Sequence, residues 1–139
     1  MIESYYNQIK MKENLRENMI DLRAALKQES KLEDWVKPEW DHQIFIDLLN
    51  SEDPKVRKNA ALILGELEVE QALEALFASY MQEETMYIRA DYLEAISRLD
   101  YMPIFPQLKQ NYDELLLADV LDDAKKHYYE EMQILQRMI

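Results

Sequence analysis

Two histidines are the side chains of this sequence best suited to metal binding or acid–base chemistry. His127 has Asp123 four residues before it and Glu131 four residues after it, so a helix would place all three on one face. Such a set could hold a divalent metal ion. Because the chain has 28 acidic residues, the same proximity is expected by chance, and a solvated helix face is the favoured interpretation. His42 is expected to cap a helix start or to face water.

The other residue types that carry catalysis are scarce. Gly65 is the only glycine, so a glycine-rich phosphate loop cannot be built, and there is no cysteine. No Ser–His nucleophile pairing is suggested by spacing. Adjacent acidic residues point to different sides of a helix, so their default role is solvation. These pairs are Glu83/Glu84, Asp122/Asp123 and Glu130/Glu131. The sequence predicts that the protein is not an enzyme and needs no cofactor or metal.

The composition indicates an all-α protein. Glycine is almost absent and residues with high helix propensity fill most positions, whereas β hairpins and barrels need glycine at many turns. The net charge of −12 disfavours direct binding to nucleic acid. The lack of cysteine is typical of a reducing compartment. No apolar stretch approaches the roughly 20 residues of a membrane span. We therefore expect a soluble, cytoplasmic protein without membrane contact.

Apolar spacing divides the chain into helices of one domain, 1–139. Residues 1–37 are expected to form an N-terminal helical cap and a linker, and the cap is either one bent helix or two, because its stripe shifts phase near Lys10. Ser30 and Glu33 have the spacing of a capping box. Helix pairs are expected at 38–67, 69–99 and 102–138. Asp53 and Thr85 are the expected N-caps of second helices, and the last segment is compatible with one continuous helix as well as with two.

An internal repeat is the most specific signal in the sequence. Aligning Val56-Arg57 with Ile88-Arg89 superimposes apolar positions four, five, eight and eleven residues after the first, at an offset of 32 residues. The same template recurs from Ala124-Lys125, and a fainter copy begins at Leu15-Arg16 with Arg23 in the eighth, normally apolar, place. Each copy after the first follows another amphipathic helix. The pattern predicts stacked antiparallel helix pairs, because one pair cannot bury its apolar face alone.

These residues resemble the HEAT-repeat family, in particular its shorter bacterial form. The match is best over Asp53-Pro54, Val56-Arg57, Ala60-Ala61 and Leu64-Gly65. The resemblance implies a short α-solenoid whose second helices line a concave, armadillo-like face. It also implies a ladder of acidic and basic residues between neighbouring repeats, at Asp53, Arg57 and Arg89.

On this interpretation the protein is a scaffold for protein–protein interaction. The off-core positions of the second helices would form the binding surface, with an acidic bias that suits another protein with a basic segment. These positions are Lys58, Leu62, Glu66, Tyr87, Asp91, Glu94, Arg98, Lys126, His127 and Glu130. The alternative is an accessory domain or subunit of an enzyme that modifies RNA or protein. A metal-dependent enzyme using His127 is the least favoured, and homodimerisation through an exposed C-terminal helix is open.

Overall fold

The computed structural model describes residues 2–99 together with 106, 110, 122 and 126. The helix pair expected at 102–138 therefore lies outside the described residues, apart from four positions. The described chain contains no strand, so the all-α prediction is confirmed for it. Its helices are α1 (Ile2–Lys10), α2 (Leu15–Glu29), α3 (Gln43–Leu48), α4 (Pro54–Glu66), α5 (Leu73–Gln82) and α6 (Met86–Ser97), with a short 3-10 helix η1 (Glu70–Ala72) before α5.

The N-terminal region forms two helices and not one bent helix. Between α1 and α2 the backbone turns through left-handed conformations at Lys12 (φ 58°) and Asn14 (φ 43°). Left-handed residues cannot continue a right-handed α-helix. The buried Asn18 closes this turn, because its side-chain amide donates to the carbonyl of Glu13 at 2.8 Å. The phase shift seen in the apolar stripe near Lys10 is the sequence signal of this break.

Helices α4 and α6 begin 32 residues apart, as the internal repeat requires. Asp53 caps α4: its carboxylate accepts from the backbone N–H of Lys55 at 2.9 Å, and Pro54 takes the first helical position. Thr85 occupies the equivalent position before α6, but its side chain makes no capping bond. The carboxylate of Glu83 instead accepts from the Thr85 N–H, at 3.4 Å.

The linker after α2 starts differently from the prediction. Ser30 stands at the C-terminal end of α2 and caps no helix start, so the expected capping box is wrong. Its hydroxyl donates to the Glu66 carboxylate of α4 at 3.0 Å, and turns follow in place of a first helical turn. The Ser30 hydroxyl therefore bonds to a residue of another helix and does not cap a helix of its own segment.

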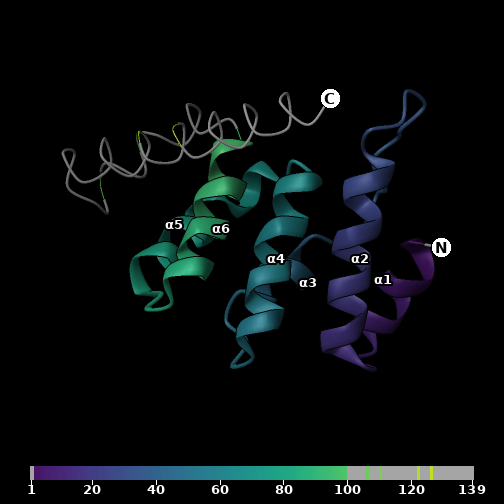
Figure 1. Ribbon diagram of the computed structural model, residues 1–139, viewed down its shortest axis with the longest axis horizontal. Helices are drawn as coiled ribbons and strands as arrows, with labels where there is room; N and C mark the ends of the chain where they lie inside the picture. Colours follow the sequence, from purple (N-terminus) through teal and green to yellow (C-terminus); the bar gives the residue numbers. More distant parts are fainter. Residues whose placement is uncertain (1, 100–105, 107–109, 111–121, 123–125, 127–139) are drawn as a thin grey trace.

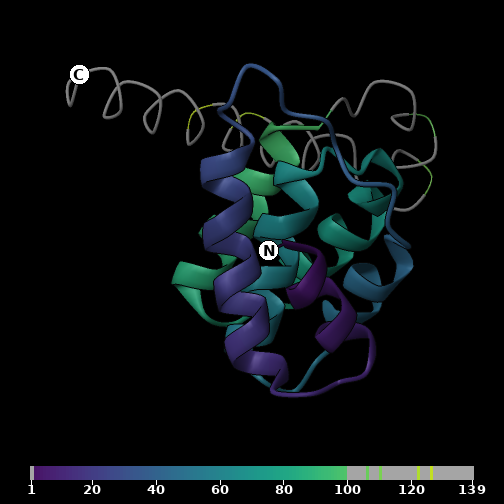
Figure 2. The same ribbon diagram turned by 90° about the vertical axis from the view of Figure 1, so that its right-hand side faces the viewer.

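The even-numbered helices lie side by side in the order α2, α4, α6 (Figure 1). Each odd-numbered helix packs on its successor: α1 on α2, α3 on α4 and α5 on α6. Viewed along this row, α1 and α3 lie on the same side of it (Figure 2). The described chain is therefore a set of six helices packed against each other, in which α4 is flanked by α2 and α6.

One hydrophobic core runs through these helices. Leu64 of α4 and Ile96 of α6 are fully buried, as the repeat template predicts, and so is the ring of Tyr92. At the N-terminal end Tyr6 stacks on Trp40 with ring centroids 4.5 Å apart. Trp35, in the linker after α2, is partly buried and packs against the same core. No helix in the part of the chain that the structure describes is long and apolar enough to cross a membrane.

At Gly65, helices α4 and α6 approach each other closely. A Cβ atom at this position would lie 3.0 Å from the Cα of Ala95 and 3.3 Å from its Cβ. Alanine is ordinarily about 1 kcal/mol better than glycine inside a helix. Here the added methyl meets the backbone of a packed helix, and overpacking costs about 1–3 kcal/mol.

We expect Gly65→Ala to lower the free energy of unfolding by about 1 kcal/mol in urea denaturation, because the steric cost exceeds the gain in helix propensity. Ala95→Gly removes one of the two contacted atoms, so the double variant should lose less than the two single variants sum to. A Gly65→Ala variant that gains the stability expected from propensity alone would contradict this close approach.

Candidate functional site

Three neighbouring helices, α2, α4 and α6, line a hollow of about 190 Å³ on the face expected to bind a partner. Six of the predicted residues meet in it: Lys58, Leu62, Glu66, Asp91, Glu94 and Arg98. Its other lining residues are Arg23, Lys27 and Ala95. The structure thus brings together side chains that are up to 75 positions apart in the chain (98 − 23).

The carboxylates of this hollow are engaged by neighbouring cations. Arg98 lies 3.3 Å from Glu66 and 3.1 Å from Glu94. Lys58 lies 4.0 Å from Asp91. All five side chains are partly or largely buried, so water screens these pairs less than it screens fully exposed ones. The pairs connect α4 to α6 across the hollow.

Tyr87 extends the same face toward the N-terminal end of α6. Its ring is 53% exposed, and the Lys58 ammonium lies 5.6 Å from the ring centroid. Lys126 is exposed and helical. His127 and Glu130, which were predicted to belong to the same surface, lie outside the described residues, as does the His127 set with Asp123 and Glu131.

Arg23 and Lys27 were not among the predicted surface residues. Both belong to α2, which lies within the predicted N-terminal cap. A signal existed, because Arg23 occupies an apolar place in the repeat template. With these two residues the described hollow has four cations and three carboxylates, so the expected acidic bias does not hold for this part of the surface.

A second depression, of about 450 Å³, lies between the α3–α4 and α5–α6 connections. Arg57 donates at its floor to Glu83 at 3.0 Å and to the carbonyls of Ser51 and Glu52 at 2.9 and 3.2 Å. The phenol of Tyr92 donates to the same Glu83 carboxylate at 3.3 Å. The Glu83 side chain is only 7% exposed. The prediction that Glu83 is solvated is wrong, because the turn before α6 places its side chain against Arg57.

Ionisation in this cluster follows from its contacts. Burial by itself raises the pKa of Glu83, but hydrogen bonds from Arg57 and from the Thr85 backbone outweigh it, so the pKa lies below its ordinary value. Burial, followed by the negative charge of Glu83, raises the pKa of Tyr92 to about 12. Near neutral pH the cluster therefore holds an arginine, a carboxylate and a neutral phenol, which is an arrangement that holds helices together.

Two of the three residues proposed as a ladder, Asp53 and Arg57, make contacts between neighbouring helix pairs. Asp53 accepts from Arg16 of α2 at 2.9 and 3.0 Å, and this bidentate bond lowers the pKa of Asp53. Arg57 of α4 reaches Glu83, as described above. Arg89 instead lies over the ring of Tyr80, 4.3 Å from its centroid. Asp53 and Arg57 therefore each connect successive helix pairs.

His42 lies at the start of α3 and makes no side-chain cap. Burial lowers the pKa of this imidazole, so it is mainly neutral near pH 7. It lines a hollow of about 510 Å³ with Trp40 and Lys37. Among the residues that the structure describes, no group of three or more His, Asp or Glu side chains is arranged to hold a metal ion.

Comparison of this chain with known protein families, with curated proteins and with solved structures gives no match. The resemblance to HEAT repeats thus rests on the residues of the internal repeat alone.

Proposed function

We propose that this chain is a non-catalytic protein-binding module, a short HEAT-like α-solenoid whose α2–α4–α6 face holds a segment of another protein. The observation that carries the proposal is the meeting of six predicted surface residues in one hollow between the neighbouring helices α2, α4 and α6. The 32-residue offset between the starts of α4 and α6 supports the repeat. The row of even-numbered helices, each backed by the preceding odd-numbered one, supports the stacking that a solenoid requires.

The side chains lining the hollow favour binding over chemistry. They are arginines, lysines, carboxylates, one leucine and one alanine, with no histidine, serine, threonine or cysteine among them. They therefore do not include the hydroxyl or thiol of a Ser–His or Cys–His nucleophile pair. Charged groups around a small apolar floor are suited to recognition of a peptide segment, because paired charges give specificity and apolar contacts give affinity.

We expect the double variant Leu62→Gln/Tyr87→Gln to weaken partner capture by about tenfold or more, because it removes the apolar anchors of this face without changing its charge. The immobilised chain would be incubated with cell extract, and captured proteins would be quantified by mass spectrometry. The matched control is Leu32→Gln/Met11→Gln, which makes similar changes at exposed apolar residues outside the hollow.

Both double variants should melt near the temperature of the parent chain. Equal loss of capture in the two variants, or no loss in either, would assign binding to some other surface and would overturn the proposal.

A further inference from the structure

The charges of the α2–α4–α6 hollow are unevenly distributed among its helices. Within the lining residues, α2 contributes two cations and no acid, α4 contributes one of each, and α6 contributes two acids and one cation. The acids on α4 and α6 have cations of those same two helices beside them: Glu66 and Glu94 have Arg98, and Asp91 has Lys58. Each of these three acids therefore has a cation beside it, and two of them share Arg98.

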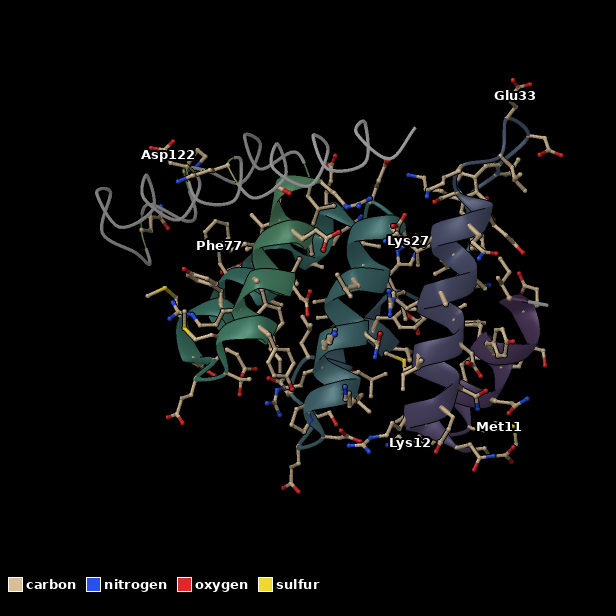
Figure 3. The ribbon with its side chains drawn as sticks, viewed as in Figure 1. Met11, Lys12, Lys27, Glu33, Phe77 and Asp122 are labelled. Carbon is tan, nitrogen blue, oxygen red and sulfur yellow. The ribbon has the colours of Figure 1, made fainter. Side chains whose placement is uncertain are left out.

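The two cations on α2 are not compensated in this way. The side-chain contact of Arg23 is a 3.3 Å hydrogen bond to the neutral amide oxygen of Asn59. Lys27 takes part in no ion pair within the described residues. Figure 3 shows Lys27 near the upper end of α2, on the side of α4. With four cations and three carboxylates, the hollow thus has a net positive charge, in a chain whose net charge is −12.

Arg23 and Lys27 stand four residues apart on one helix, where like charges repel each other. An anion placed between them would relieve this repulsion and would gain charge-assisted hydrogen bonds from both groups. Leu62 and Ala95 supply the apolar part of the same lining. A single carboxylate on an otherwise apolar segment fits such a lining. A chain of phosphates would meet Glu66, Asp91 and Glu94 at close range.

We infer that the partner segment places an aspartate or glutamate side chain into this hollow, between Arg23 and Lys27 and against Leu62. The inference rests on the proposed function and defines its partner: an acidic, amphipathic protein segment, in place of the basic one expected from the predicted surface residues alone. Asp91 and Glu94, two of the acids that a basic segment would contact, already lie beside Lys58 and Arg98.

Two blocked peptides of identical length, built of alanine and leucine with either glutamate or lysine at the same positions, provide the test. Each is titrated into the full isotope-labelled chain while backbone amide shifts are followed by NMR. The glutamate peptide is expected to shift the amides of Arg23, Lys27 and Leu62, with a Kd that rises steeply with salt. Arg23→Glu/Lys27→Glu should weaken binding of the glutamate peptide by about tenfold or more, because both cationic partners of its carboxylate are replaced by acids.

The matched control is Lys12→Glu/Lys55→Glu, which makes the same charge change outside the hollow; Lys12 lies at the opposite end of α2 from Lys27 (Figure 3). The control should bind the glutamate peptide within about twofold of the parent, a difference of about 0.4 kcal/mol. Equal weakening by both variants would reduce the effect to net charge and overturn the inference. Preference for the lysine peptide, or shifts from neither peptide, would overturn it as well. The same shifts from inorganic phosphate alone would identify a nonspecific anion site and also overturn it.

Failure of the inference that the partner segment is acidic can be distinguished from failure of the proposed protein-binding function. If Leu62→Gln/Tyr87→Gln abolishes capture and Arg23→Glu/Lys27→Glu does not, the face binds a partner but not through an acidic side chain. If neither double variant reduces capture, both proposals fail.

Discussion

Replacing Leu64 with alanine is expected to lower the free energy of unfolding by about 2–5 kcal/mol. Leu64 is fully buried in α4, the helix that packs against both α2 and α6. Truncation removes buried methyl groups and leaves a cavity that packed helices can close only in part. Ile96→Ala in α6 should cost a similar amount, because this side chain is also fully buried. Urea denaturation should show a lower midpoint with little change in slope.

Leu62→Ala is the matched control, because it makes the same chemical change two residues away on the same helix. Leu62 lines the surface hollow and is only partly buried, so its truncation should cost about 1 kcal/mol or less. Equal losses from Leu64→Ala and Leu62→Ala would mean that α4 does not present different faces to the core and to the hollow. The stacking of the helix pairs would then need another explanation.

Breaking the Arg57–Glu83 pair is expected to have an effect of the same size. Arg57→Met should lower the free energy of unfolding by about 3–5 kcal/mol, because it leaves Glu83 buried without its counter-charge. The side chains of the pair are 20% and 7% exposed. Two backbone carbonyls, of Ser51 and Glu52, lose their donor at the same time. Thermal and urea denaturation would measure the loss.

The control for this prediction is Arg16→Met. Arg16 forms a bidentate pair with Asp53, but its side chain is 53% exposed, and exposed ion pairs contribute about 0–1 kcal/mol. Because Glu83→Gln removes the buried charge, Arg57→Met in that background should cost less than in the parent chain. A loss for Arg57→Met no larger than that for Arg16→Met would show that burial does not determine the strength of this pair.

The same pair predicts how stability depends on pH. The folded pKa of Glu83 lies below its ordinary value of 4.5, so its stabilising contribution is complete above the unfolded value. That contribution is lost as the pH falls through the folded pKa. Glu83→Gln should therefore make the free energy of unfolding less sensitive to pH on the acid side of 4.5, which urea titrations at several pH values would detect.

The positions of the helices were largely predictable, because they depend on local signals. The phase shift near Lys10 marked the break that Lys12 and Asn14 make with left-handed backbone. Asp53-Pro54 marked the start of α4, since the Asp side chain bonds to an amide only two residues away. The prediction of a capping box at Ser30 was wrong because a long-range contact decided the outcome. The Ser30 hydroxyl donates to Glu66 on another helix, and no local rule could predict that bond.

The candidate site was also predictable only in part. Helical spacing placed Lys58 and Leu62 on one face of α4 and Asp91, Glu94 and Arg98 on one face of α6, and the structure brings these two faces together. Helical spacing did not indicate that Arg23 and Lys27 complete the surface, because their position relative to α4 depends on how α2 packs on it. It also gave no sign that Glu83 is buried, because exposure of a charged residue depends on a partner 26 positions away in the chain.

The sequence by itself determined the helical character of this protein, most helix starts and the residues of the core, because helix propensity, capping and apolar periodicity act over a few neighbouring residues. Tertiary structure alone decided which charges are paired: Arg98 and Lys58 lie beside the three acids of the hollow, and Arg23 and Lys27 form no ion pair within the described residues. The physical reason is that Coulomb energy depends on distance and burial in the folded chain, and the order of residues specifies neither until the helices have packed.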